Sequence, residues 1–465
     1  MKFKPLASGL ANPWVALILI VATVFVIYSN VYDGPFVFDG KIQIEDKEKI
    51  RDLKNYMSLK GFFSHRPLTE FSFAVNYRMG KLEPFGYHLG NILIHAVNGI
   101  LAYLLALCVF SQLSFFPSAK RPIAVNGNEH GAHVRWKHGG VSSTSNHLMA
   151  LLAALIFVAH PIQTQSVTYM VQRYTSMAAM FYLLSVLFYI KARKLQSQFG
   201  LDSGFESGMP TGAISPGLSK KESHPFGFKV LIRFFFFLFF SVLAMLCKEN
   251  SASLFGVILL VEYFLFDRSW AGWRRKLIWL VPVSCLLAFL VLYLLSSMRG
   301  FRFENLLEDV SILTRETRTV DRWSYFCTQF TVLVQYIRLL FFPVGQNLDH
   351  LYPMRTGFFD GLTPLAFIFV LAVIFLGIWN IKKRPAISFG IFWFFITLSI
   401  ESSIFPISDA MFEHRLYLPM FGFAVSLVYG VFEVVSGRKA WAGMTLLAVV
   451  LAFGIGTYLR NRVWQ

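Results

Sequence analysis

The sequence predicts an all-α, polytopic membrane protein. Hydrophobic residues make up 55% of the 465 residues, phenylalanine alone occurs 50 times, and charged residues are only 15%. A chain with so little polar surface cannot cover its apolar mass in water. The apolar residues also form long runs, and each run suits a bilayer core of about 30 Å. These observations exclude a soluble globular protein.

The first apolar run, residues 14–28, follows Lys2 and Lys4 and so imitates a signal peptide. Because no small-residue cleavage site follows it, we expect an uncleaved first span. Eleven spans are expected, at approximately 11–29, 88–110, 146–160, 174–191, 230–247, 251–267, 277–297, 362–380, 386–401, 416–435 and 440–458.

Basic residues explain the orientation of these spans. The net charge is +17, which invites a nucleic-acid interpretation, but Lys and Arg gather in short loops between alternate apolar runs. With the N-terminus in the cytoplasm, these loops all fall inside, as the positive-inside rule requires. Topology therefore accounts for the charge, and no nucleic-acid partner is expected.

The loops divide the single domain, residues 1–465, into distinct parts. The first outer loop spans 30–87 and is expected to be helical, and a second covers 299–361. Segments 111–146 and 195–228 are rich in Gly, Ser, His and Pro, which predicts flexible cytoplasmic loops rather than metal sites. The four cysteines are scattered, so neither a disulfide framework nor a metal-ligand spacing is visible.

Residues 322–342 are apolar enough to cross, but Arg322, Gln329, Gln335 and Arg338 interrupt them. If they crossed, the basic run 382–384 would move outside. We therefore expect an interfacial or re-entrant helix on the outer face.

Asp39 is the most informative single residue. It lies in the stretch 30–40, directly after the first span, so its carboxylate is held at a membrane surface. Ionisable residues in such places usually have a function. The alternative is that Asp39 is one loop acid among several, with Glu45, Asp46 and Glu48 close behind.

Further polar side chains recur at the outer boundary, where they would hold a negatively charged lipid phosphate. The alternative for each is an interhelical hydrogen bond or a snorkelling side chain, and for His95 we favour the hydrogen bond. For Lys248 and Glu249 the alternative to a functional role is that the two side chains neutralise each other. The candidates are Arg66, His88, Asn91, His160, Arg173, Lys248, Glu249, Glu413, His414 and Arg415.

These motifs occur in a characteristic order: Phe36 to Asp39, Arg66 to Thr69, Tyr87 to Asn91 with His95, His160-Pro161 with Arg173, Lys248-Glu249, and Glu413 to Pro419. Together they resemble the GT-C glycosyltransferases of the transmembrane and tetratricopeptide-repeat O-mannosyltransferase type, in particular the bacterial relatives. The resemblance covers the chain apart from the cytoplasmic inserts.

The resemblance implies a GT-C fold of about 11 transmembrane helices in the bacterial inner membrane, with its active site facing the periplasm. It also implies a polyprenyl-phosphate-linked sugar donor, a periplasmic protein Ser or Thr hydroxyl as acceptor, and Asp39 as catalytic base, with inversion at the anomeric carbon.

Two departures from the family pattern stand out. The family has a second acid where this chain has Gly40, so no cofactor is predicted and a divalent metal is disfavoured. Residues 457–465 look like the junction into a repeat array. Either the repeats are lost or truncated, or another protein, such as a separate tetratricopeptide-repeat protein, presents the acceptor.

Two other functions remain open. One is a same-fold transferase that modifies lipid A, a glycan or a polymer subunit. The other is a transporter or lipid-carrier flippase, for which repeat symmetry and helices broken by Gly or Pro near the bilayer midplane would be expected. The polar clusters lie at one face, which disfavours this alternative.

Overall fold

The computed structural model describes residues 12–57, 66–113, 143–198, 224–268, 273, 320–403, 406–407, 409–435 and 439–464. Within these ranges the chain is helical and has no β-strand, as predicted. The helices are α2 (Pro13–Ile27), α4 (Pro67–Gly80), α5 (Pro84–Leu113), α6 (Ser143–Ala159), α7 (Thr164–Val167), α8 (Arg173–Gln198), α9 (His224–Cys247), α10 (Leu254–Val261), α13 (Arg322–Phe341), α14 (Thr363–Asn380), α15 (Pro385–Leu398), α16 (Pro419–Val434) and α17 (Lys439–Asn461).

Several predicted segments lie outside the described residues. They are the span 277–297, residues 299–319 of the second outer loop, and most of the predicted cytoplasmic loops 111–146 and 195–228. Every other predicted span overlaps a helix.

Six helical segments of the described chain are long and apolar enough to cross a membrane, or seven if α6 and residues 161–167, bent by 51°, form one span. Helices α2, α15 and α16 are apolar but shorter. The chain is therefore a multi-pass membrane protein. The count of eleven spans and the GT-C topology stay predictions.

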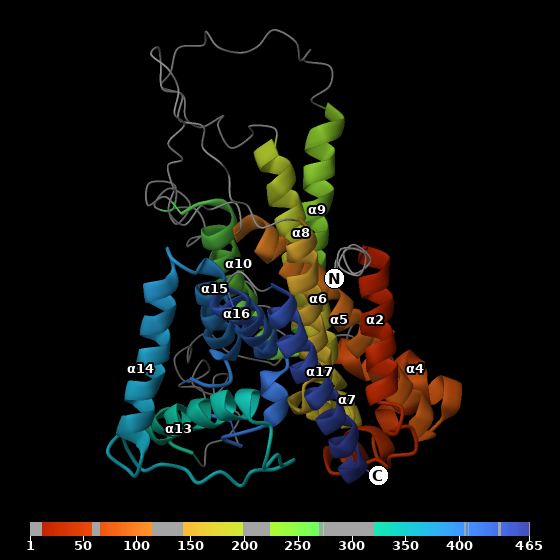
Figure 1. The fold of residues 1–465 in the computed structure, drawn as a ribbon. Coiled ribbons are helices and arrows are strands. Elements are labelled where there is room, and N and C mark those ends of the chain that lie inside the picture. The colour runs from red at the N-terminus through yellow and green to blue at the C-terminus, as the bar shows by residue number, and fades with distance from the viewer. Residues whose placement is uncertain are drawn as a thin grey trace, which may run out of the picture.

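Helix α13 differs from its neighbours. It is capped by Asp321, whose carboxylate accepts hydrogen bonds from the amides of Trp323 and Ser324. Although it has 20 residues, it is not among the helices apolar enough to span. It runs across the direction of α14 rather than along it (Figure 1). An interfacial or re-entrant position for α13 stays a prediction.

Close helix packing is clearest between α15 and α16. A Cβ atom on Gly390 would collide with the carbonyl group of Gly422, and a Cβ on Gly422 would collide with that of Gly390. The two backbones therefore touch, as small residues allow in membrane helices.

Buried polar groups join α5 to its neighbours. His95 contacts the Tyr417 hydroxyl through Nδ1, at 2.7 Å, and the Val158 carbonyl through Nε2, at 3.1 Å. Asn98 donates to the same hydroxyl at 2.9 Å. The interhelical hydrogen bond expected for His95 is confirmed.

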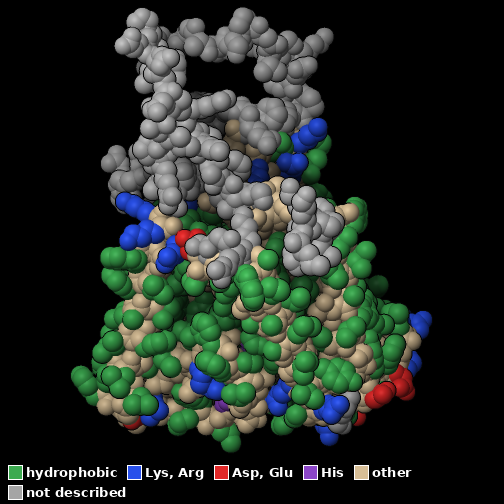
Figure 2. All heavy atoms as spheres, viewed as in Figure 1, with side chains coloured by type: hydrophobic (Ala, Val, Ile, Leu, Met, Phe, Trp, Pro, Cys, Tyr) green, Lys and Arg blue, Asp and Glu red, His purple; other side chains and the backbone are tan. Residues whose placement is uncertain are grey.

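Charged side chains lie mainly toward the two ends of the face shown in Figure 2, and hydrophobic side chains dominate the band between them. The first loop, α4, α7, α13 and the end of α17 lie at one end of the molecule (Figure 1). The candidate site is at this end.

Candidate active site

Asp39 lies in the first loop, between two segments of unusual backbone conformation. Phe38 before it has φ = +46°, which is uncommon for a residue other than glycine. The π-helical turn η1 (Lys41–Glu45) follows it. The Asp39 side chain is exposed, and its backbone amide donates a 3.0 Å hydrogen bond to the hydroxyl of Tyr169. The loop thus presents the carboxylate outward while fixing the backbone behind it.

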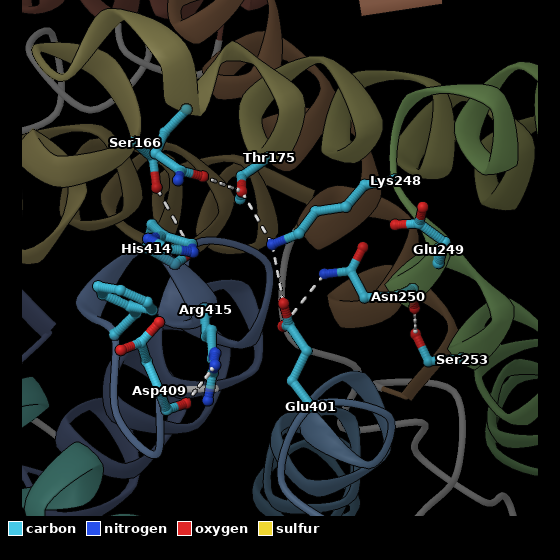
Figure 3. Close-up of polar contacts among 12 residues, drawn as sticks. Ser166, Thr175, Lys248, Glu249, Asn250, Ser253, Glu401, Asp409, His414 and Arg415 are labelled. Atoms are coloured by element: carbon cyan, nitrogen blue, oxygen red, sulfur yellow. Dashed lines mark hydrogen bonds and ion pairs between the residues drawn. The ribbon is translucent and has the colours of Figure 1, made fainter. Parts of the chain in front are cut away.

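A buried ion pair joins two loops at the same end of the bundle. The Nζ atom of Lys248 lies 2.8 Å from the carboxylate of Glu401 (Figure 3). Asn250 donates to that carboxylate at 3.2 Å, and Lys248 donates to the hydroxyl of Thr175 at 3.2 Å. Burial of both charges is tolerable because each has a close partner and further hydrogen bonds.

The structure corrects one interpretation of the sequence. Lys248 and Glu249 do not neutralise each other: Lys248 pairs with Glu401, and Glu249 pairs with Arg66 at 3.0 Å. The reason is that Lys248 has an extended backbone, which directs neighbouring side chains to different sides. Glu249 lies apart from the buried pair of Lys248 and Glu401 (Figure 3).

Arg66 lies at the margin of this region. Its guanidinium group lies 5.3 Å from the centre of the Tyr174 ring, in a cation–π contact. It precedes α4 with φ = +51°, in the left-handed region. Tyr174 lies within electrostatic range of Asp39 as well as Arg66, so the exposed acid and this cation share one neighbourhood.

Arg415 is buried in the last outer loop. It donates to the carbonyl oxygens of Ala410, at 3.0 Å, and Asp409, at 2.8 Å, and it contacts the Phe412 ring. These contacts fold the loop around the guanidinium group. A small cavity adjoins it, with Thr175, Tyr182, Asn250, Arg415 and Pro419 among its lining residues.

Three cations converge on His414. Burial lowers the pKa of His414 well below its usual value, and the charges of Lys248, Arg415 and Arg66 lower it further. His414 is therefore neutral at pH 7. Its Nδ1 atom lies 3.2 Å from the side-chain oxygen of Gln165.

Carboxylates gather beside these cations. Burial and the charge of Asp349 raise the pKa of Asp409, the charge of Arg415 opposes this, and Asp39 raises it further. Asp409 therefore lies within electrostatic range of two acids, Asp349 and Asp39, and of the cation Arg415. The site combines an acidic side with a basic side.

Glu413 binds the neighbouring loop, residues 346–350, through hydrogen bonds. It is almost fully buried, and its carboxylate accepts from Gln346 at 2.9 Å, from the Asn347 amide at 2.7 Å and from His350 at 2.9 Å. Glu413 thus fastens residues 346–350 next to the Arg415 loop.

The chain is 23% identical to protein O-mannosyl-transferase Tmtc3 of Drosophila melanogaster over 86% of its own length and 43% of that protein. It is 29% identical to human protein O-mannosyl-transferase TMTC4 over 42% of this chain and 20% of that protein. With human protein O-mannosyl-transferase TMTC2 it shares 33% identity over 28% of this chain and 11% of that protein.

The chain is a homologue of these protein O-mannosyl-transferases. It spans less than half the length of the relatives it matches. No family model and no solved structure matches the chain.

Four candidate residues form hydrogen bonds apart from Arg66, Lys248 and Arg415. Arg173 donates to Asn91 and Asn76, both at 2.6 Å, and to the Tyr87 carbonyl at 2.8 Å. Asn91 also donates to the carbonyl oxygens of residues 167 and 170, and His88 contacts the Gly34 carbonyl at 3.1 Å. Arg173 and Asn91 therefore bind each other, and His88 binds the first loop at Gly34 and so supports it.

His160, the fourth, lies in the core. It is fully buried, with its ring nitrogens against the Leu340 carbonyl, at 3.0 Å, and the Ile162 amide, at 3.1 Å. It therefore lies in a packed helix junction.

The candidate residues chosen from the sequence lack four that the structure brings to this site: Tyr169, Thr175, Asn250 and Glu401. Glu401 offered a signal, because it is an acid directly after an apolar run. The other three are neutral and stand beside candidates in the sequence, which gave no reason to select them.

Among the described residues, no three His, Cys, Asp or Glu side chains are grouped so as to hold a metal ion. Gly40 occupies the position of the second acid expected from the family pattern.

Proposed function

We propose that this protein is a glycosyltransferase that moves a sugar from a polyprenyl-phosphate carrier to a Ser or Thr hydroxyl of a protein. One observation carries the proposal: an exposed carboxylate, Asp39, lies at the same end of the bundle as three cations, Arg66, Lys248 and Arg415, whose charges all act on His414. The names of the homologues favour mannose as the sugar and a protein as the acceptor.

The cations supply the donor side of the reaction. A phosphate leaving group develops negative charge as the glycosidic bond breaks, and fixed donors stabilise that charge without reorganising. Arg415 is held in place by backbone carbonyls, and Lys248 is held by Glu401 and Thr175. Arg66 is more exposed, so it suits contact with a carrier that enters from the membrane.

Asp39 supplies the acceptor side. Its carboxylate takes the proton from the acceptor hydroxyl while the hydroxyl oxygen bonds to the anomeric carbon. The bond between that carbon and the phosphate oxygen breaks, and the polyprenyl phosphate leaves with the electron pair. Such a direct displacement inverts the configuration at the anomeric carbon. General-base assistance contributes typically about 10² to 10⁴-fold.

The orientation of the protein is part of the proposal. Basic residues in alternate loops place the Asp39 end on the non-cytoplasmic side. In the inner membrane of a bacterium, this end faces the periplasm, where lipid-linked sugars and secreted acceptors meet.

A reconstituted transfer assay tests the function. The protein, purified into nanodiscs, is given a polyprenyl-phosphate mannose and a Ser/Thr-rich peptide, and mass spectrometry follows the peptide. We expect one hexose on a hydroxyl residue, with the α or β configuration opposite to that of the donor. Hexose transfer to lipid A or a glycan, with none to peptides or to secreted proteins, would contradict the protein acceptor. Transbilayer movement of the donor without transfer would contradict the enzyme.

A further inference from the structure

The amide of Asp39 is bound to a residue that lies 130 positions later in the chain. Its N–H donates to the hydroxyl oxygen of Tyr169 at 3.0 Å. Because that oxygen acts as acceptor toward the amide, the hydroxyl proton is free to point to the Asp39 carboxylate. Burial and the Asp39 charge both raise the pKa of Tyr169, so the hydroxyl keeps its proton. The Tyr169 hydroxyl thus binds the Asp39 backbone and also interacts with the charge of the Asp39 carboxylate.

Tyr169 is itself fixed by the end of the described chain. Its ring stacks on Trp464, with ring centres 5.4 Å apart and planes inclined by 23°. Both rings belong to a hydrophobic cluster separate from the main core, which also includes Phe36 of the first loop. A Cβ atom on Gly34 would lie 3.1 Å from the Trp464 carbonyl, so the first loop rests against this segment.

Asn461 ties the same parts together by hydrogen bonds. It is fully buried, donates to the Ile27 carbonyl at 2.9 Å, and accepts from the Thr168 hydroxyl at 2.7 Å. Asn30 in turn donates to the Tyr458 carbonyl at 2.9 Å. The end of α17 therefore lies against the first loop, as Figure 1 shows.

We propose that Tyr169 is a positioning residue for Asp39, and that the segment 461–464, anchored by its buried residues Asn461 and Trp464, holds Tyr169 in place through Trp464. The proposal rests on the proposed role of Asp39 as base. Phe38 and Asp39 are exposed, and Phe38 lies in the left-handed region. The contact with Tyr169 gives this part of the loop a fixed support at Asp39. A carboxylate that moves by about 1 Å can lose about 10²-fold in rate.

Tyr169→Phe is the sharpest test, because it keeps the ring and its stack on Trp464 and removes the hydroxyl alone. In the nanodisc transfer assay we expect kcat to fall by about 10 to 100-fold, with the KM for the donor within about twofold because the cations are untouched. The matched control is Tyr458→Phe, which removes a hydroxyl from α17 and leaves the backbone carbonyl that Asn30 uses. It should retain wild-type kcat.

The role of Trp464 is tested by rescue. Trp464→Leu should lower kcat like Tyr169→Phe, because the stacked ring is lost, whereas Trp464→Phe should recover most of the rate. Equal kcat values for Trp464→Leu and Trp464→Phe would contradict the role of the ring stack between Tyr169 and Trp464.

The two levels of the proposal fail differently. If Asp39→Asn is inactive and Tyr169→Phe turns over like the wild type, Tyr169 does not position the base, and the proposed function stands. If Asp39→Asn turns over like the wild type, the base itself is misassigned and this inference falls with it. A lower thermal midpoint for Tyr169→Phe, with kcat unchanged at a temperature well below that midpoint, would show that the hydroxyl only stabilises the fold.

Discussion

The ammonium group of Lys248 lies 2.8 Å from the carboxylate of Glu401, and both side chains are buried. The pair connects the break between α9 and α10 with the loop after α15. It also sets the charge of the donor side, because burial lowers the pKa of Lys248 and Glu401 opposes that effect.

Glu401→Gln should weaken both stability and activity. Breaking one side of a buried pair costs about 3 to 5 kcal/mol. Without the carboxylate the pKa of Lys248 falls further, so the alkaline limb of the pH–activity profile should move to lower pH. Glu249→Gln is the control, since its partner Arg66 is more exposed and such a pair is worth about 1 kcal/mol or less. An unchanged alkaline limb in Glu401→Gln would contradict the role of Lys248.

Asp39→Asn should abolish most turnover without unfolding the protein. The side chain is exposed and keeps its size, so thermal stability and donor binding should match the wild type. We expect kcat to fall by at least about 10²-fold, because an amide cannot accept the proton. Glu45→Gln, in the same loop, should remain active. The reverse pattern would move the base to Glu45.

Arg415→Lys should recover only part of the function that Arg415→Ala loses. A lysine keeps the charge but cannot donate to two oxygens in one plane. We expect about a tenfold loss in donor kcat/KM for Lys and a larger loss for Ala. Full activity in Arg415→Lys would mean that the residue acts as a simple charge or anchors the start of α16.

Chelation should leave the activity intact. With side-chain cations facing the leaving phosphate and Gly40 beside Asp39, we expect transfer to proceed after EDTA treatment. Loss of transfer on chelation, restored by added Mg²⁺ or Mn²⁺, would contradict this prediction.

Reporter fusions should resolve the topology. We expect cytoplasmic signals after Arg193 and Lys383, and periplasmic signals after Lys60, Asn347 and Gln465, from the distribution of basic residues. A periplasmic signal at Lys383 would show that α13 crosses the membrane.

Local patterns in the sequence predicted most of the helices but not the pairing of side chains. Apolar runs predicted the helix positions because hydropathy is a property of a short window. The partner of Lys248 was misjudged because Glu401 is distant in sequence, whereas Glu249 is adjacent. Arg173 illustrates the same difficulty: a cation at a span end suggested a phosphate ligand, yet the fold surrounds it with Asn91, Asn76 and Tyr87.

The contact between Gly390 and Gly422 has a consequence for the distant loop. Because the two backbones touch there, α15 and α16 cannot slide or separate without opening a void between them. The segment that joins them carries both Glu401 and Arg415. Because neither glycine carries a side chain, the two helices approach closely at this contact, and the segment with Glu401 and Arg415 is held between two helices that are packed backbone to backbone.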